Sequence, residues 1–469
     1  MQIVIIGAGI SGLATGYYLK QKYPQADIEI LEKCSRAGGV ARGLALDGFL
    51  IEQGPTLVPC FGKGHAVLEL IAELGLEKKI IAHFKQQNIY FYKNKALRHL
   101  PLNIAGLLGS GLTPGLLRAL LKDLLSEPVL QWDVIEESVA SYCIRHFGSQ
   151  LTTALIEPLI RCLWAGDMQK LSLPALFPIL ADFDNTYGSV IKGWLAYQAP
   201  VYGNVSALPK TLLGQRFVRL AGGMQTLTDR LTKILESHIR FEAEVRDIVP
   251  HASGFRIYLA DGVYRDADIV VSTLPAHTLS HCLYQVNPDL IETLKSVTYA
   301  PLAIASLTYD QPIPGPDGIG HMVADGDRQA VLGAYWVHKF APDCVPDGKS
   351  LFNVILGGAQ HSLFNSFDEH HLIRLAESHL KEVFGIRAKP SIEICKLIPH
   401  AIPQFNLGTL KGELRLQALA PNNLYITGSF RTGHGLGDMV YNAKHLAVNL
   451  ALKSLAPDSG IEDRKISLA

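Results

Sequence analysis

The stretch MQIVIIGAGISGLATGYYLKQKYPQADIEILEK, residues 1–33, decides the fold. A run of β-branched residues at 2–6 predicts a buried parallel strand, the apolar spacing over 11–22 predicts a helix, and 27–31 predicts a second strand. A strand, a glycine turn and a helix in this order indicate a Rossmann-type α/β fold that binds a dinucleotide.

The glycine turn carries a Gly-x-Gly-x-x-Gly pattern, made of Gly7, Ala8, Gly9, Ile10, Ser11 and Gly12. Gly7 permits the tight turn, Gly9 lets the backbone approach a pyrophosphate, and Gly12 lets helix and strand pack closely. The N-terminus of the helix then faces the phosphates. Glu32 follows the second strand, where its carboxylate can accept hydrogen bonds from ribose hydroxyls.

Length and charge limit the class of protein. A chain of 469 residues exceeds the usual size of one core, so two or three domains are expected. Lys plus Arg and Asp plus Glu both number 43, so the basic footprint of a nucleic-acid binder is missing and no nucleic acid is expected as a partner. The mean hydropathy of +0.17 indicates an apolar substrate, a membrane surface, or both.

The seven cysteines stand singly and form no CxxC pair. Neither a disulfide framework nor a metal site is expected, and reduced thiols in the cytoplasm are the simpler interpretation. The opening MQIVIIGAG lacks the basic start and the cleavage site of a signal peptide. We therefore expect a cytoplasmic protein, with peripheral attachment to the inner face of the cell membrane as an open alternative.

Residues 101–125 are unusually rich in leucine. They also hold Pro114, Arg118, Lys122 and several glycines, which a spanning helix of roughly 20 apolar residues would not tolerate. Two interpretations stay open, a buried helical hairpin and an element that docks on a membrane surface. Further helices are expected over 130–185.

The rest of the chain is expected to contain both strands and helices. Strands are expected over 240–257, 268–273 and 424–427, with a larger set over 300–360, and a helix over 438–450. The final residues, DSGIEDRKISLA, have the composition of a disordered tail.

Two further glycine-rich segments indicate which dinucleotide cofactor is bound. Gly38, Gly39 and Arg42 follow the second strand and resemble the extended dinucleotide motif of the FAD-dependent amine oxidase superfamily, in which the glycine pair brings backbone against the FAD diphosphate. Arg42 either adds charge there or is an ordinary surface arginine. The segment NLYITGSFRTGHGLGDMV at 423–440 predicts a strand, a glycine loop and a helix start, whose backbone donors suit the pyrimidine end of a flavin. Non-covalent FAD is the expected cofactor.

Within this superfamily the chain resembles the porphyrinogen oxidases of haem synthesis. The resemblance covers nearly the whole chain through motifs that follow one another in order: LIEQGPTLV at 50–58, ALIEPLIRCLWAGDMQKLSLPALFP at 154–178, RLAGGMQTLTDRL at 219–231, GIGHMV at 318–323, VILGG at 354–358, IPHAIPQFNLG at 398–408 and GSFRTGHGLGDMV at 428–440.

This family implies an α/β protein with a Rossmann-type FAD-binding domain, a mixed-sheet substrate domain and a helical membrane-docking domain. On this sequence the expected boundaries are 1–85, 191–295 and 395–455 for FAD binding, 86–100 and 296–394 for the substrate domain, 101–190 for the helical domain and 456–469 for a disordered tail.

The resemblance also implies site residues by matching position. The FAD contacts are Gly7, Ala8, Gly9, Ile10, Ser11, Gly12, Glu32, Lys33, Gly39, Val40, Arg42, Gly54, Pro55, Thr56, Leu57, Val245, Ser429, His434, Gly435 and Leu436. The substrate pocket has apolar walls at Ile319, Met322 and Ile355 and backbone at Ala165 and Gly166. Without the resemblance, the wall residues would be read as ordinary core. No catalytic residue and no metal ligand are implied.

Three positions depart from the family pattern. Ile89 stands where many members place a pocket arginine, which leaves open how the propionates of the substrate are held. His434 replaces a small apolar residue, and it is either a catalytic base or a packing or solvent-facing side chain. Ser429 stands where many members have Asn.

The expected reaction is the oxidation of protoporphyrinogen IX to protoporphyrin IX, with hydride transfer to FAD and reoxidation by oxygen or another acceptor. Coproporphyrinogen III oxidation to coproporphyrin III is the first alternative. An amine oxidase or carotenoid-type desaturase is the second, and a flavin-bearing scaffold or haem-handling protein without turnover is the third. The expected partners are the porphyrinogen and the acceptor, with a membrane surface and a second copy of the chain left open.

Overall fold

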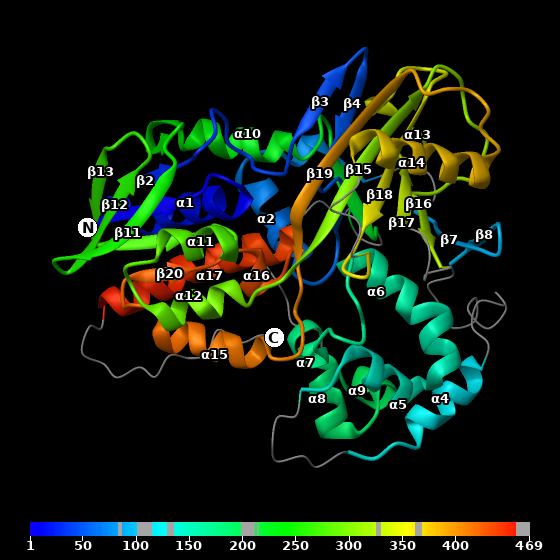
Figure 1. Cartoon of the computed structure of the whole chain (residues 1–469), viewed down its shortest axis with the longest axis horizontal. Helices are drawn as coiled ribbons and strands as arrows, with labels where there is room; N and C mark the ends of the chain where they lie inside the picture. The colour runs from blue at the N-terminus through cyan, green and yellow to red at the C-terminus, as the bar shows by residue number, and fades with distance from the viewer. Residues whose placement is uncertain are drawn as a thin grey trace.

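The computed structural model describes residues 1–82, 87–100, 115–128, 136–197, 212, 215–324, 330–361 and 368–455. The first part of the leucine-rich segment, 101–114, and the tail at 456–469 lie outside these residues. Three parts are visible in Figure 1: a parallel sheet between helices, a larger mixed sheet beside it, and a bundle of helices below the mixed sheet.

The parallel sheet begins with the predicted strands, which are confirmed. Its five strands lie in the order β10 (Ile239–Arg240), β2 (Asp27–Leu31), β1 (Gln2–Ile6), β14 (Ile269–Ser272) and β20 (Leu424–Ile426). The strands come from the beginning, the middle and the end of the chain, so this part is discontinuous in sequence. With these strands in parallel around β1, the Rossmann-type α/β class is confirmed.

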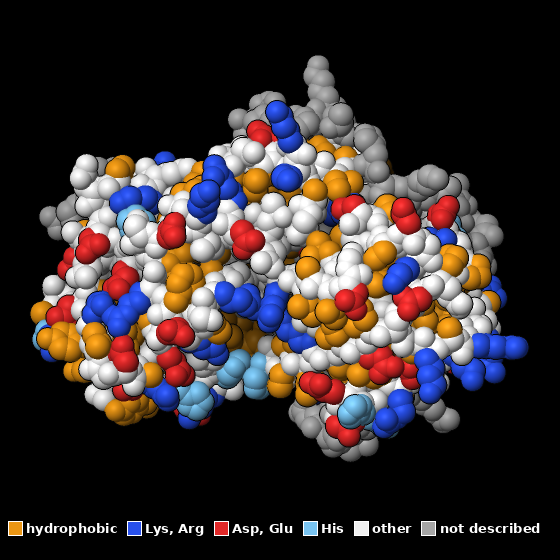
Figure 2. Space-filling model, turned by 90° about the horizontal axis from the view of Figure 1, so that it is seen from above, with side chains coloured by type: hydrophobic (Ala, Val, Ile, Leu, Met, Phe, Trp, Pro, Cys, Tyr) orange, Lys and Arg blue, Asp and Glu red, His pale blue; other side chains and the backbone are white. Residues whose placement is uncertain are grey.

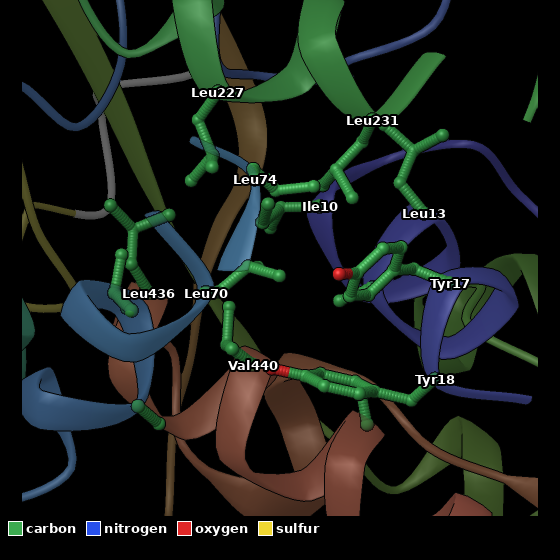
Figure 3. Packing of buried hydrophobic residues seen from close by; sticks show 14 of the residues in the cluster. Ile10, Leu13, Tyr17, Tyr18, Leu70, Leu74, Leu227, Leu231, Leu436 and Val440 are labelled. Carbon is green, nitrogen blue, oxygen red and sulfur yellow. The ribbon is translucent and has the colours of Figure 1, made fainter. Parts of the chain in front are cut away.

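One face of the parallel sheet is covered by helices that meet in an apolar core (Figure 3). They are α1 (Ile10–Lys22), α2 (Gly64–Glu73), α10 (Gln225–Ile234) and α17 (Leu436–Leu455). Leu13 from α1, Leu70 from α2, Leu231 from α10 and Val440 from α17 are all fully buried there. The C-terminal helix therefore contributes to the same core as the first helix of the chain.

The other face of the parallel sheet carries a second core. It is formed with the antiparallel strands β11 (Val245–His251), β12 (Gly254–Leu259) and β13 (Tyr264–Ala267) and with the helices α11 (Ala276–Cys282), α12 (Pro288–Lys295) and α15 (Thr409–Leu419).

The mixed sheet has seven strands, in the order β19 (Ile392–Pro403), β15 (Tyr299–Tyr309), β18 (Ser350–Gly357), β17 (Val331–Trp336), β16 (Gly320–Val323), β7 (Ile89–Lys93) and β8 (Ala96–His99). All neighbours are antiparallel except β16 and β7. The expected domain boundary at 394/395 falls inside β19, because this strand stays paired with β15 as far as Pro403.

The register of the mixed sheet separates its two faces. One face packs against α14 (Glu369–Phe384) and is mostly apolar. The opposite face, called the open face below, carries Leu302 and Ile304 of β15, Asn353 and Ile355 of β18, Tyr335 of β17, Met322 of β16, Ile89 of β7 and Lys396 of β19. Side chains of directly paired residues share a face, so these eight belong to one surface.

Two histidines lie buried behind the open face. His321 of β16 and His379 of α14 place their Nε2 atoms 2.7 Å apart, and Trp336 Nε1 donates a hydrogen bond of 3.0 Å to His321 Nδ1. The indole can only donate, so His321 Nδ1 accepts, and the proton of its neutral ring is on Nε2, which donates to His379. Burial lowers the pKa of His321 and lowers that of His379 to about 4.

We expect acid to weaken the protein through this pair. A histidine whose pKa is lower in the folded state binds a proton more readily when unfolded, so stability is lost as the pH falls from about 6.5 toward about 4. The slope is about 1.4 kcal/mol per pH unit for one histidine. In His379→Gln the amide oxygen can still accept from His321, but the side chain cannot titrate. Denaturant unfolding over this pH range should show a smaller slope for the variant, and equal slopes would contradict the assignment.

The helical part contains α4 (Leu116–Leu124), α5 (Val139–Leu151), α6 (Glu157–Trp164), α7 (Leu173–Leu176), α8 (Pro178–Tyr187) and α9 (Val190–Ala196). Because α9 packs against α4 and α8, this part extends past the expected boundary at 190. Every helix among the described residues is too short or too polar to cross a membrane.

A buried ionic network holds these helices together. His146 of α5 is fully buried, with Nδ1 2.6 Å from Asp123 of α4 and Nε2 3.2 Å from Asp184 of α8. Burial alone would lower the pKa of His146, but the hydrogen bonds to the two carboxylates outweigh it and raise this pKa. Asp123 also accepts from the Ser189 hydroxyl and from the first two amides of α9. One carboxylate therefore connects three helices.

Candidate functional site

The glycine turn after β1 has the geometry that the sequence predicts. Gly7 has φ +99°, and a Cβ atom added at Gly12 would lie 1.8 Å from the carbonyl oxygen of Gly7. Only glycine at residue 12 therefore lets α1 start this close to β1. At Gly9 an added Cβ atom would meet nothing within 4 Å. The space in front of Gly9 is open, as a diphosphate would require.

Glu32 lies beside this turn and is 9% exposed. Its Oε2 accepts a hydrogen bond of 2.8 Å from the Ala8 amide, and its Oε1 accepts one of 2.9 Å from the Cys34 amide. These bonds fix the carboxylate at the end of β2, and each oxygen keeps a lone pair for a ribose hydroxyl.

The second glycine pair meets the first turn through backbone contacts. Gly38 and Gly39 have φ +98° and +58°, and the Gly38 amide donates to the Ala8 carbonyl at 2.8 Å. A Cβ atom at Gly39 would lie 3.3 Å from the Gly9 Cα, and one at Gly54 would lie 2.2 Å from the Val40 oxygen. Three segments, around residues 8, 39 and 54, therefore form one backbone cradle, with Val40 exposed beside it.

Arg36 and Arg42 lie close enough to Lys396 to affect its pKa. Lys396 on the open face donates to the Gln53 carbonyl at 3.2 Å. Its pKa is lowered, first by burial and then by the positive charges of Arg36 and Arg42. Arg42 thus brings positive charge to the boundary between the cradle and the mixed sheet, as an anionic diphosphate favours.

The closing loop lies at the carboxyl end of β20. The amide of Thr427 donates to the Ser272 carbonyl at 2.8 Å, and Gly428 and Ser429 follow directly. Gly433 has φ +105°, after which His434, Gly435 and Leu436 lead into α17. Leu436 and Ile10 are buried in the same core, so the starts of α17 and α1 lie together (Figure 3).

The remaining predicted contacts surround the cradle. Pro55, Thr56 and Leu57 continue from Gly54 and are half-buried. Lys33 is exposed next to Glu32, and Val245 starts β11, close to the hydrogen bond from the Ala243 amide to the Glu32 carbonyl. The open cradle, the placed carboxylate and the helix starts fit the diphosphate, ribose and ring of FAD. Direct contact of each residue with FAD stays a prediction.

Three side chains from different elements lie close to α6 and to the turn that follows it. Tyr335 is 39% exposed, although burial raises the pKa of its hydroxyl. Cys162 of α6 is half-buried, and burial raises the pKa of its thiol to about 12. His434 is also half-buried, and burial lowers its pKa. Cys162 acts electrostatically on the Tyr335 hydroxyl, and His434 contacts the Leu163 carbonyl of the same helix. The three side chains therefore lie around α6, and they are called the cavity wall below.

Figure 2 shows a hollow on one face of the molecule, with apolar side chains in its depth and Lys, Arg and His side chains around it.

The structure brings together most of the predicted pocket residues. Ala165, with φ +50°, and Gly166 form the turn after α6, and the Ala165 carbonyl accepts from the Ala359 amide at 2.7 Å. A small pocket is lined by this turn, Arg161 and residues 357–361. Ile355 packs against Ala165, and Met322 lies farther along the open face.

Ile319 does not pack with the other predicted pocket residues. It is 4% exposed and packs with Phe49, Ile51 and Val337 in the core between β4 (Phe49–Glu52) and the mixed sheet. Its side chain therefore belongs to that core, and substrate contact at this position stays a prediction.

Hydrogen bonds tie the open face to the strand before Gly54. Asn353 donates to the Glu52 carbonyl at 3.0 Å, parallel to the Lys396 bond at Gln53. The Glu52 carboxylate accepts from the Met224 amide at 2.7 Å, and burial raises its pKa to about 7. The FAD cradle and the cavity wall are therefore joined by specific bonds.

Sequence reasoning missed three residues of this region, Tyr335, Cys162 and Lys396. Alternation along β17 and β19 could have placed Tyr335 and Lys396 on one face, but only the observed strand pairing shows that this face is the open one. Among the described residues, no three His, Cys, Asp or Glu side chains gather as metal ligands would. The seven cysteines form no disulfide in the structure.

Comparison with known proteins shows the family to which the chain belongs. Residues 10–437 match the model of flavin-containing amine oxidoreductases. The coproporphyrinogen III oxidase of Staphylococcus aureus is 27% identical, over 94% of this chain and 97% of its own. The protoporphyrinogen oxidase of Homo sapiens is 28% identical, over 96% and 98%.

Solved structures share the fold. A candidate protoporphyrinogen oxidase from Exiguobacterium aligns with a TM-score of 0.80 at 23% identity, over 96% of this chain and 99% of its own. The cyclohexylamine oxidase of Brevibacterium oxydans aligns with a TM-score of 0.70 at 16% identity, over 97% and 99%. The cradle, the placed carboxylate and the family match together make this chain an FAD-dependent oxidoreductase. It belongs to the flavin-containing amine oxidoreductase family.

Proposed function

We propose that this enzyme oxidises a porphyrinogen in haem biosynthesis, and that protoporphyrinogen IX is its preferred substrate. The observation that carries the proposal is the apolar open face beside the FAD cradle, with Leu302, Ile304, Ile355 and Met322 side by side. Such a surface suits a large apolar tetrapyrrole. The names of the relatives from Staphylococcus aureus and Homo sapiens support the substrate class.

In this reaction the main role of the protein is to position the substrate against FAD. Bound FAD supplies an acceptor for the hydride that leaves a bridging carbon of the substrate. The chain's own side chains hold the macrocycle against the open face and exclude water. Oxygen or another acceptor then takes up the electrons.

The proposed preference for protoporphyrinogen follows from the number of carboxylates that each substrate carries. Protoporphyrinogen carries two propionates and coproporphyrinogen carries four, and a buried carboxylate without a cation is costly. Ile89 lies on the open face where a cation was expected. One observation favours coproporphyrinogen III as the substrate. Arg161 and Lys396 bring two cations to the edges of the cavity.

The test is anaerobic mixing of the FAD-loaded enzyme with each porphyrinogen. We expect the flavin absorbance to bleach, with protoporphyrinogen reacting at least about tenfold more efficiently, which corresponds to roughly 1.4 kcal/mol of transition-state binding. A preference for coproporphyrinogen would reverse the assignment. Bleaching by an amine instead would favour an amine oxidase, and no bleaching by any substrate would favour a scaffold without turnover.

We further propose that the helical part attaches the enzyme to a membrane surface. Large apolar side chains are exposed on α4 and α9, where Leu117 is 62%, Leu121 61%, Leu125 81%, Trp194 65% and Leu195 80% exposed. Arg118, Lys122 and Lys192 are exposed on the same two helices and can reach lipid headgroups. An exposed apolar face bordered by cations favours anionic lipid.

Vesicle co-sedimentation tests this attachment. The variant with Leu117, Leu121 and Leu125 changed to Ser should lose binding to vesicles that contain anionic lipid, because it removes apolar surface while the buried Leu116 stays in place. Serine at Leu407 and Leu414, which are 47% and 64% exposed outside α4 and α9, is the matched control and should bind normally. Equal binding by both variants would show that α4 does not insert.

A further inference from the structure

His434 connects the closing loop to the end of α6. Its Nε2 lies 3.2 Å from the carbonyl oxygen of Leu163, and its ring meets the edge of Trp164 at 6.2 Å between centroids. Leu163 and Trp164 lead directly into the Ala165–Gly166 turn. The imidazole therefore projects toward α6 and the cavity wall, while backbone donors begin α17 on the other side.

The hydrogen bond at Nε2 selects one tautomer. A carbonyl oxygen only accepts, so Nε2 carries the proton and donates it to Leu163. Burial lowers the pKa of the imidazole, which keeps the ring neutral near pH 7. Nδ1 then holds a lone pair. It makes no hydrogen bond with the described part of the chain, and it is not among the fully enclosed polar atoms.

The two other titratable groups identified on this wall cannot take up a proton. Burial raises the pKa of the Cys162 thiol to about 12 and also raises that of the Tyr335 hydroxyl, so both remain protonated near neutral pH. Cys162 donates its own hydrogen bond to the Leu332 carbonyl at 2.8 Å. Of these three side chains, the imidazole of His434 is therefore the one that can accept a proton.

We propose that Nδ1 of His434 accepts the pyrrole proton that the substrate loses during oxidation. This inference rests on the proposed function. When hydride leaves the bridging carbon for the flavin, positive charge spreads to the adjacent pyrrole nitrogen. The N–H bond then breaks, its electron pair stays on nitrogen to give the neutral imine, and its proton forms a bond with Nδ1. The imidazolium later returns this proton to water.

The surroundings of His434 suit a transient imidazolium. The Nε2–H bond to Leu163 becomes charge-assisted when the ring is protonated. Asp438 in the first turn of α17 raises the pKa of His434 in part against the effect of burial, and it is itself paired with Lys63 at 3.4 Å. Asp438 is thus the charged group that acts on the imidazole, and the hydrogen bond of Nε2 goes to the Leu163 carbonyl.

Two variants separate proton transfer from structure. His434→Gln keeps an N–H donor for Leu163 but has no basic nitrogen, whereas His434→Phe loses both. Both proteins should retain FAD. In anaerobic single-turnover mixing with protoporphyrinogen, we expect flavin reduction by His434→Gln to be about 10²-fold slower than wild type or slower still. The wild-type rate should fall in acid as the imidazole becomes protonated, and His434→Gln should lack this dependence.

A purely structural role predicts the opposite pattern, with His434→Gln equal to wild type at every pH and only His434→Phe impaired, and that result would overturn the proposal. A second measurement needs no turnover. Nitrogen NMR of the FAD-loaded enzyme at neutral pH should show His434 with Nδ1 unprotonated, and a protonated Nδ1 would also overturn it. If the wild-type flavin is not reduced by any porphyrinogen, the proposed function fails, and the proton transfer fails with it.

Discussion

Gly9→Leu is expected to give a folded, colourless protein. Residue 9 has φ −71° and ψ −179°, which any L-residue adopts, and a Cβ atom there meets nothing within 4 Å. The backbone therefore accepts a Cβ atom at residue 9 without strain. The same open space is where backbone and diphosphate must approach each other, so leucine would fill the position of the cofactor. We expect bound FAD to fall from one per chain to below detection, with a circular dichroism spectrum like that of wild-type apoprotein.

Two other glycines serve as comparisons. Gly412→Leu adds the same side chain to α15 in a site that also has nothing within 4 Å, and it should keep its FAD. Gly12→Leu forces a Cβ atom to 1.8 Å from the Gly7 oxygen and should impair folding itself. A yellow Gly9→Leu protein with full flavin content would disprove the cradle assignment.

Asp123→Ala should have the largest effect on stability. The carboxylate is fully buried and accepts hydrogen bonds from His146 at 2.6 Å, the Ser189 hydroxyl at 2.7 Å and the Ile191 amide at 2.9 Å. Alanine leaves these donors without an acceptor in the interior. Removing one partner of a buried ion pair typically costs about 3–5 kcal/mol. We expect α4 and α9 to separate locally before the rest of the protein unfolds.

Hydrogen exchange read by mass spectrometry measures this local opening. Protection of amides in α4 and α9 should drop on the order of 10³-fold in Asp123→Ala, while the parallel sheet keeps its protection. Asp182→Ala on α8 is the matched control, because Asp182 is exposed and lies close in sequence to Asp184 of the network. Unchanged protection in Asp123→Ala would mean that packing alone holds these helices.

The sequence was sufficient to predict the start of the fold because its signals are local. The strands 2–6 and 27–31 were predicted to the residue, and the helix between them differs by one residue at its start. A glycine turn, a buried β-branched run and an apolar helix stripe each act within a few residues. The positive φ at Gly7 and the placement of Glu32 follow from the same short segment.

The cavity wall could not be predicted in this way because it depends on strand pairing. Tyr335 and Lys396 share the open face only because β17, β18, β15 and β19 pair in one particular register. A shift of one residue would turn either side chain to the face of α14. Ile319 shows the same limit, since a match to a family motif gave its position in sequence but not the direction of its side chain.

The path of the chain through the parallel sheet has a consequence for biosynthesis. β20 and α17 leave the ribosome long after β1 and α1, yet one pairs with β14 and the other packs against α1. The cradle formed by the first residues therefore stays without its closing loop until residues 424–455 have been made. A nascent or prematurely terminated chain has an unpaired edge at β14 and an uncovered apolar core, which are features that chaperones bind. The ability to bind the cofactor therefore arises only after β20 and α17 have been made, so that chains terminated before β20 stay colourless.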